Sequence, residues 1–142
     1  MNCMDKYACY EPQPLPEKVV WLLGKVDAHC ELINKGVREV ALVSPYWTDE
    51  QHKLYYGRIR KVARSYELKT LAHAESRKGC DSITKRWVYY LYAPDANRKL
   101  NELVAAFERV SEKPNDKATH RKIGRLLRYS RVAIEKRYGK AA

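Results

Sequence analysis

The sequence predicts an α+β fold, in which helices pack against a small sheet of three strands and a basic helical tail follows. Three observations lead to this prediction. Apolar residues recur at helical spacing in residues 17–35 and 96–110. Residues 87–92 are apolar or aromatic at every position, which is typical of a central strand covered on both faces. Positive charge is concentrated at the C-terminal end. The expected order of elements is α-β-α-β-β-α-α-α.

The first third of the chain is expected to form an arm, a helix and a strand. Residues 1–16 contain three prolines and should form an extended arm. The helix over residues 17–35 should bury one apolar stripe and end at Gly36. This stripe consists of Val19, Leu22, Leu23, Val26, Cys30 and Ile33. Residues 37–44 are then expected to form a strand, because residues 40–43 are a short apolar run.

A capping box is expected to open the second helix, over residues 49–65. Thr48 and Gln51 are spaced so that each side chain can bond a backbone amide of the other residue. Residues 68–75 and 85–93 have the composition of two strands, and a polar loop joins them as a hairpin.

Three further helices are expected to complete the chain. Asp95 should cap a helix over residues 96–110, which ends before the break at residues 113–116. The two remaining helices should cover residues 117–128 and 131–138.

The chain has the size of one domain, with 142 residues of which 45% are hydrophobic. We expect an α+β core over residues 17–112. The basic helical tail, residues 113–142, should pack on this core because so short a segment cannot form a core of its own.

The charge of the chain lies mainly in its last 26 residues. Nine Lys or Arg residues and one acid, Glu135, leave this segment with a net +8 of the chain's formal +11. Lys117, Arg121, Arg125 and Arg128 are spaced to form one row on a helix. A row of cations with almost no acids beside it is typical of a surface that binds phosphates.

Twelve basic residues are therefore candidates for contact with nucleic acid. Those in the tail are Lys117, Arg121, Lys122, Arg125, Arg128, Arg131, Lys136 and Arg137. Secondary sites are Arg58, Lys61 and Arg64 on the second helix and Lys78 in the hairpin loop.

Residues 120–137 resemble a helix-turn-helix unit. In that family a small residue in the first helix lets the second helix pack closely, and Gly124 has this place. Ser130 would cap the second helix, and Arg128 stands where the turn usually has a glycine with positive φ. The apolar positions are matched by Ile123, Leu127, Tyr129 and Ile134. The resemblance implies DNA binding, usually as a dimer. Residues 124–129 are also similar to the end of uncharacterised archaeal α+β proteins, which implies no function.

Other functional classes find little support in the sequence. No apolar run reaches the roughly 18 residues of a membrane span, and the N-terminus does not resemble a signal peptide. We therefore expect a cytoplasmic protein with no membrane partner and with reduced cysteines. The cysteines are Cys3, Cys9, Cys30 and Cys80, and none is spaced as in a zinc site. Glycine-rich nucleotide-binding loops are absent and the acidic residues are scattered along the chain, so we expect neither a cofactor nor a metal.

The leading hypothesis is a non-enzymatic protein that binds the phosphates of DNA or RNA through its basic C-terminal helices. One alternative is a protein-interaction factor of a phage or mobile element. It would inhibit a host nucleic-acid-binding or defence complex by occupying the nucleic-acid site or an acidic protein surface of that complex. A second alternative is a small metal-independent ribonuclease that uses His73 or His120 as acid or base. The sequence also allows a homodimer, in which Trp21 and Trp47 are candidate contacts if they are exposed.

Overall fold

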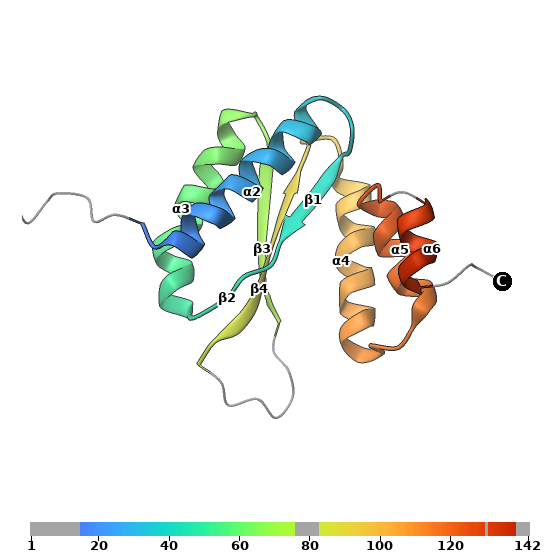
Figure 1. Ribbon diagram of the computed structural model, residues 1–142. Coiled ribbons are helices and arrows are strands. Elements are labelled where there is room, and N and C mark those ends of the chain that lie inside the picture. Colours follow the sequence, from blue (N-terminus) through green and yellow to red (C-terminus); the bar gives the residue numbers. More distant parts are fainter. Residues whose placement is uncertain (1–14, 76–82, 130, 139–142) are drawn as a thin grey trace, which may run out of the picture.

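The computed structural model describes residues 15–75, 83–129 and 131–138, without the side chain of Arg131 (Figure 1). The helices are α2 (Glu17–Asn34), α3 (Asp49–Ser65), α4 (Asn97–Glu112), α5 (Lys117–Leu126) and α6 (Arg131–Tyr138). The strands are β1 (Val40–Val43), β2 (Tyr46–Trp47), β3 (Lys69–Glu75) and β4 (Lys85–Tyr92). The predicted α+β class is confirmed, and so are the predicted bounds of α3 and α6. The predicted arm lies almost wholly outside the described residues.

Strand β4 is the centre of an antiparallel sheet. It pairs with β3 along one edge, where Leu71 lies opposite Tyr90. Along its other edge it pairs first with β2 and then with β1, where Val43 lies opposite Tyr89. The sheet therefore has three rows of backbone, and β1 and β2 share one of them.

The sequence predicted three strands, whereas the structure has four. The difference arises at Pro45, which lies between β1 and β2 and has no N–H to donate to β4. Its carbonyl still accepts a bond of 2.9 Å from the amide of Trp87, so the two short strands stay in line. The predicted start of this strand at Val37 is also wrong, because the Val37 amide bonds to the Leu32 carbonyl at the end of α2.

Helices cover the two faces of the sheet, with α2 and α3 on one side and α4, α5 and α6 on the other (Figure 1). Side chains of β4 alternate between the two cores. Tyr89 and Leu91 pack with α2 and α3, whereas Val88 and Tyr90 pack with α4 and α5. The uninterrupted apolar run in β4 follows from this burial on both faces.

Helices α2, α3 and α5 end in the same backbone arrangement, the Schellman motif. In α2, the amides of Gly36 and Val37 bond to the carbonyls of Ile33 and Leu32. Glu67 after α3 and Arg128 after α5 occupy the position in this motif that Gly36 occupies after α2. The φ angles of Gly36, Glu67 and Arg128 are all positive, at 78°, 59° and 62°. The motif requires a left-handed residue at this position, which glycine adopts without strain.

The helix starts agree with the predictions at α3 but not at α4. The Gln51 amide donates to Thr48 Oγ1 at 3.1 Å and the Thr48 amide to Gln51 Oε1 at 2.9 Å, so the capping box is confirmed. Asp95 does not cap α4. The residue at the cap is Ala96, and its amide bonds to the Ala93 carbonyl in a turn that contains Asp95.

A hydrogen-bonded aromatic cluster joins α3 to the sheet. Trp47 Nε1 donates to the Tyr89 hydroxyl at 2.9 Å, and His52 Nδ1 lies 2.7 Å from the same oxygen. Tyr89 donates its own hydrogen to His52 when Nδ1 of the imidazole carries none, and Nδ1 donates to Tyr89 when it is protonated. The His52 ring stacks on Trp87 with ring centroids 3.8 Å apart. Burial lowers the pKa of His52, and the carboxylate of Asp49 opposes this shift in part.

We expect the free energy of unfolding to decrease as the pH falls through 6.5, the ordinary pKa of histidine. Because the pKa of His52 is lowered in the folded protein, the unfolded chain takes up the proton first. The stabilisation is therefore complete above this pH and is lost below it, until the lowered pKa is reached. Urea unfolding on both sides of this pH measures the effect.

The His52→Gln variant should show a shallower decrease than the wild type. His73→Gln, at an exposed position of β3, is the matched control and should decrease like the wild type. His29, whose pKa burial also lowers, contributes in both variants. An undiminished pH dependence in His52→Gln would contradict the assignment.

Candidate nucleic-acid interface

Helix α5 packs onto α4, and α6 packs onto α5. Ile123 and Leu127 of the α5 segment are buried in the core that contains Leu103 of α4. A Cβ atom on Gly124 would lie 2.9 Å from Ile134 Cγ1, so α6 approaches the backbone of α5 more closely than a side chain there would allow. Gly124 therefore lies at the helix contact, as the sequence predicted for a small residue. Among the four predicted apolar positions, Tyr129 is the exposed one.

Asp116 holds the corner between α4 and α5. Its carboxylate accepts hydrogen bonds from Arg109 Nε at 2.7 Å and from Thr119 Oγ1 at 2.8 Å. It also accepts the Thr119 amide at the start of α5. The Arg109 hydrogen bond, followed by those of Thr119, lowers the pKa of Asp116 to about 2. The cap therefore stays ionised at neutral pH and fixes the direction in which α5 leaves the core.

Arg128 has the left-handed conformation that ends α5. Its amide bonds to the Arg125 carbonyl at 3.0 Å, and the Tyr129 amide bonds to the Gly124 carbonyl at 2.9 Å. The helix consequently ends at Leu126, two residues before the predicted end. An exposed cation thus occupies a position that glycine would occupy with less strain.

The cations of the tail are not all directed to solvent. The exposed ones with described side chains are Lys117, Lys122, Arg125, Arg128, Lys136 and Arg137. Arg121, by contrast, is half-buried, and its Nη2 donates to the Tyr138 carbonyl at 3.3 Å, so it joins α5 to α6. The predicted row along α5 is therefore interrupted at its second member.

Three of the exposed cations surround a shallow hollow between α4 and α5. Lys122, Arg125 and Arg128 line it from the α5 side and Lys99 from α4, and its volume is about 370 Å³. Among the described residues, no carboxylate forms an ion pair with Lys122, Arg125 or Arg128. The hollow has one acid, Glu102, which lies 3.7 Å from Arg98.

Lys99 is the residue of this surface that sequence reasoning missed. It lies on α4, outside the basic tail, and its ammonium is 3.0 Å from Glu39. Only the packing of α5 against α4 brings it beside the cations of the tail, so no sequence signal was available.

The secondary basic residues are not part of the same surface. Arg58, Lys61 and Arg64 are exposed on α3, on the opposite side of the sheet from α5 (Figure 1). Lys78 lies outside the described residues, as does the side chain of Arg131.

The two candidate acid–base histidines lie in different settings. His120 stacks on Tyr138, with centroids 5.1 Å apart, and its Nε2 is 2.7 Å from the Pro114 carbonyl, so its ring packs between α6 and the α4–α5 turn. His73 is exposed on β3. Of the four cysteines the structure describes Cys30, a buried thiol whose pKa burial raises to about 11.

The described part of the chain has no group of three His, Cys, Asp or Glu side chains placed to hold a metal ion. Its helices also include none that is both long and apolar enough to cross a membrane.

The strain at Arg128 can be measured. We expect Arg128→Gly to raise the free energy of unfolding by up to about 1 kcal/mol, because a left-handed residue with a Cβ is strained. Arg128→Ala keeps the Cβ and should give no such gain. Chemical denaturation of the three proteins makes the comparison, and a gain in both variants would show that the charge, not the backbone, is responsible.

Two other helix ends serve as matched controls. Glu67→Gly should stabilise the protein by a similar amount, since Glu67 has the same conformation after α3. Gly36→Ala should destabilise it by roughly 1 kcal/mol, because alanine would then be forced into the left-handed region.

A comparison with models of known protein families, with curated proteins and with solved structures found no match to this chain. The function is therefore inferred from the geometry and charge of the described residues. Among these, the cations around the hollow between α4 and α5 are the most distinctive group.

Proposed function

We propose that this protein binds nucleic acid without enzymatic chemistry, and that the basic surface of α5 and its neighbours contacts the phosphate backbone. The observation that carries the proposal is the hollow lined by Lys99, Lys122, Arg125 and Arg128. Cations from two helices converge there, and those from the α5 segment have no carboxylate partner among the described residues.

The chemistry of this surface suits phosphate. Two of its four cations are arginines, whose planar guanidinium can bond two phosphate oxygens at once. Binding of unpaired cations to phosphates is favourable because it releases the counterions condensed on the nucleic acid. A cationic side chain that already had a carboxylate partner would have to break that ion pair first.

The composition of α6 gives no support to the reading of adenine. This helix has eight residues, and its exposed side chains with described positions include Val132, Lys136 and Arg137. Asn and Gln, which read adenine with paired hydrogen bonds, do not occur in it, and Lys136 and Arg137 can bond either phosphates or guanine. Cations that contact phosphates orient a protein on nucleic acid but do not select its sequence.

The salt dependence of binding tests the proposal. The Lys122→Ala/Arg125→Ala/Arg128→Ala variant should bind a fluorescein-labelled DNA duplex more weakly than the wild type. Its plot of log Kobs against log salt concentration should be shallower by roughly 2.7, at about 0.9 per lost phosphate contact. Fluorescence anisotropy over a series of NaCl concentrations gives both slopes, and a single-stranded RNA measured in parallel compares the two nucleic acids.

The control variant Arg58→Ala/Lys61→Ala/Arg64→Ala removes the same number of charges from the other side of the sheet. It should keep the wild-type slope, because α3 is not part of the proposed surface. Equal losses in both triple variants would mean that total charge, not this surface, governs binding. If the wild type binds neither DNA nor RNA at low salt, the proposal is wrong.

A further inference from the structure

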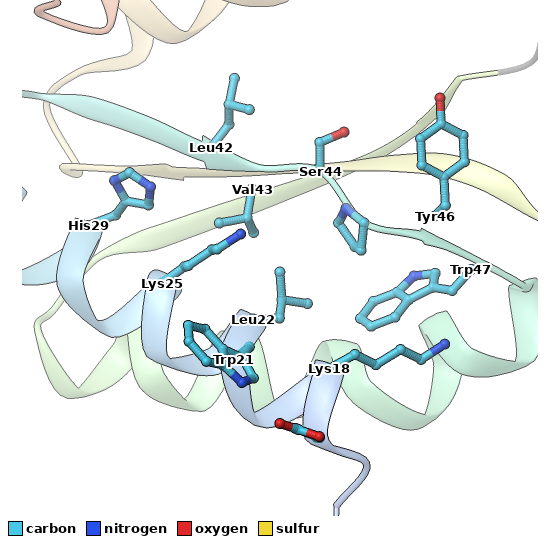
Figure 2. A pocket seen from close by; sticks show the side chains of 12 residues that line it. Lys18, Trp21, Leu22, Lys25, His29, Leu42, Val43, Ser44, Tyr46 and Trp47 are labelled. Atoms are coloured by element: carbon cyan, nitrogen blue, oxygen red, sulfur yellow. The ribbon is translucent and has the colours of Figure 1, made fainter.

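A second concave surface lies between α2 and the row formed by β1 and β2 (Figure 2). This groove has a volume of about 820 Å³. Its helical wall presents Lys18, Trp21, Leu22 and Lys25, which face the strand segment of residues 42–47 (Figure 2). It is on the α2 side of the molecule, away from the hollow between α4 and α5.

The strand side of the groove is an open sheet edge. Glu39 accepts a backbone bond of 3.1 Å from Ala93, directly after β4, and Pro45 accepts one of 2.9 Å from Trp87 of β4. Because backbone groups of an antiparallel strand face its two sides alternately, Leu42, Ser44 and Tyr46 direct theirs away from β4. All three line the groove, and β1 and β2 pair with no other strand of the described residues. Their N–H and C=O groups are therefore placed to pair with an added strand.

The walls of the groove combine apolar surface with positive charge. Trp21 is 67% exposed, although tryptophan is usually covered, and Leu22 and Val43 lie in the same lining. Lys18 and Lys25 are exposed, and neither forms an ion pair among the described residues. One acid, Glu17, lies at the end of the groove where α2 begins.

We propose that this groove binds an extended peptide with acidic side chains, which adds to the sheet as a strand beside β1 and β2. The backbone edge supplies the hydrogen bonds, the Trp21 side chain covers apolar residues of the peptide, and Lys18 and Lys25 pair with its carboxylates. This inference does not depend on the nucleic-acid proposal, because the two surfaces share no residue.

The charge of the groove decides between possible occupants. In a symmetric pairing of two copies, Lys18 and Lys25 of one copy would face Lys18 and Lys25 of the other. These like charges repel each other, and each copy also has a formal net charge of +11. Nucleic acid would satisfy the cations but has no backbone N–H and C=O in the repeat of a β-strand, so the open edge would stay unpaired. An acidic peptide satisfies both features.

A random dodecapeptide library displayed on phage and selected on the full-length protein tests this inference. We expect the selected peptides to alternate apolar and acidic residues. As synthetic peptides they should bind the Lys18→Glu/Lys25→Glu variant at least roughly tenfold more weakly than the wild type in isothermal titration calorimetry. Lys53→Glu/Lys61→Glu, two reversals at exposed positions of α3, is the control for total charge and should bind nearly as well as the wild type.

A second pair of variants tests the role of the sheet edge. Tyr46→Pro removes one outward N–H without removing a bond to β4 and should abolish binding, whereas Tyr46→Thr keeps this N–H and should retain it. Circular dichroism shows whether each variant is folded. If Tyr46→Pro does not fold, the Lys18→Glu/Lys25→Glu variant still tests whether the peptide binds in the groove.

Three outcomes would overturn the inference. The selection could yield no peptides whose binding responds to the groove variants. Light scattering could show a dimer that Tyr46→Pro dissociates, which would make a second copy the occupant. A labelled single-stranded DNA could displace the peptides from the wild type and fail to bind the Lys18→Glu/Lys25→Glu variant, which would make nucleic acid the occupant. The triple variant of the α5 surface should still bind the peptides, so failure of one proposal leaves the other testable.

Discussion

Strand β4 is hydrogen-bonded along both of its edges and covered by helices on both of its faces, and the other elements are arranged around it. Tyr89 and Leu91 anchor one core and Val88 and Tyr90 the other. A polar substitution at these positions would leave an unpaired group in a dry core, which costs more than the loss of a surface contact. Because the strand separates two cores, it also separates the two surfaces to which we assign functions.

The basic surface depends on local order at both ends of α5. Asp116, bonded to Arg109 and Thr119, fixes the start of the helix, and the left-handed Arg128 fixes its end. Glycine would suit the backbone at position 128 better. The side chain of Arg128 lies beside Lys122 and Arg125 on the rim of the hollow, which is the surface that we propose for phosphate binding.

The groove has a different physical origin. Pro45 interrupts the ladder to β4, and the row of β1 and β2 forms an edge with no neighbouring strand among the described residues. Proteins usually protect such edges with charges, prolines or a covering segment. Here Pro45 faces the paired side, so the open side keeps its donors and acceptors, and α2 stands beside it rather than over it. The α+β core can thus carry two binding surfaces of different chemistry.

The sequence by itself determined the features that depend on neighbouring residues. The apolar run of β4 and the capping box of α3 could be predicted, because periodicity and capping are local, whereas Gly124 and Arg128 were singled out by the resemblance to a helix-turn-helix unit. Tertiary structure alone decided the pairing of β2 with β4 in line with β1, the approach of Lys99 to the tail, the inward turn of Arg121 and the placement of the α3 cations on the far side of the sheet. These depend on which elements pack together, and packing between distant segments leaves no trace in the spacing of residues along the chain.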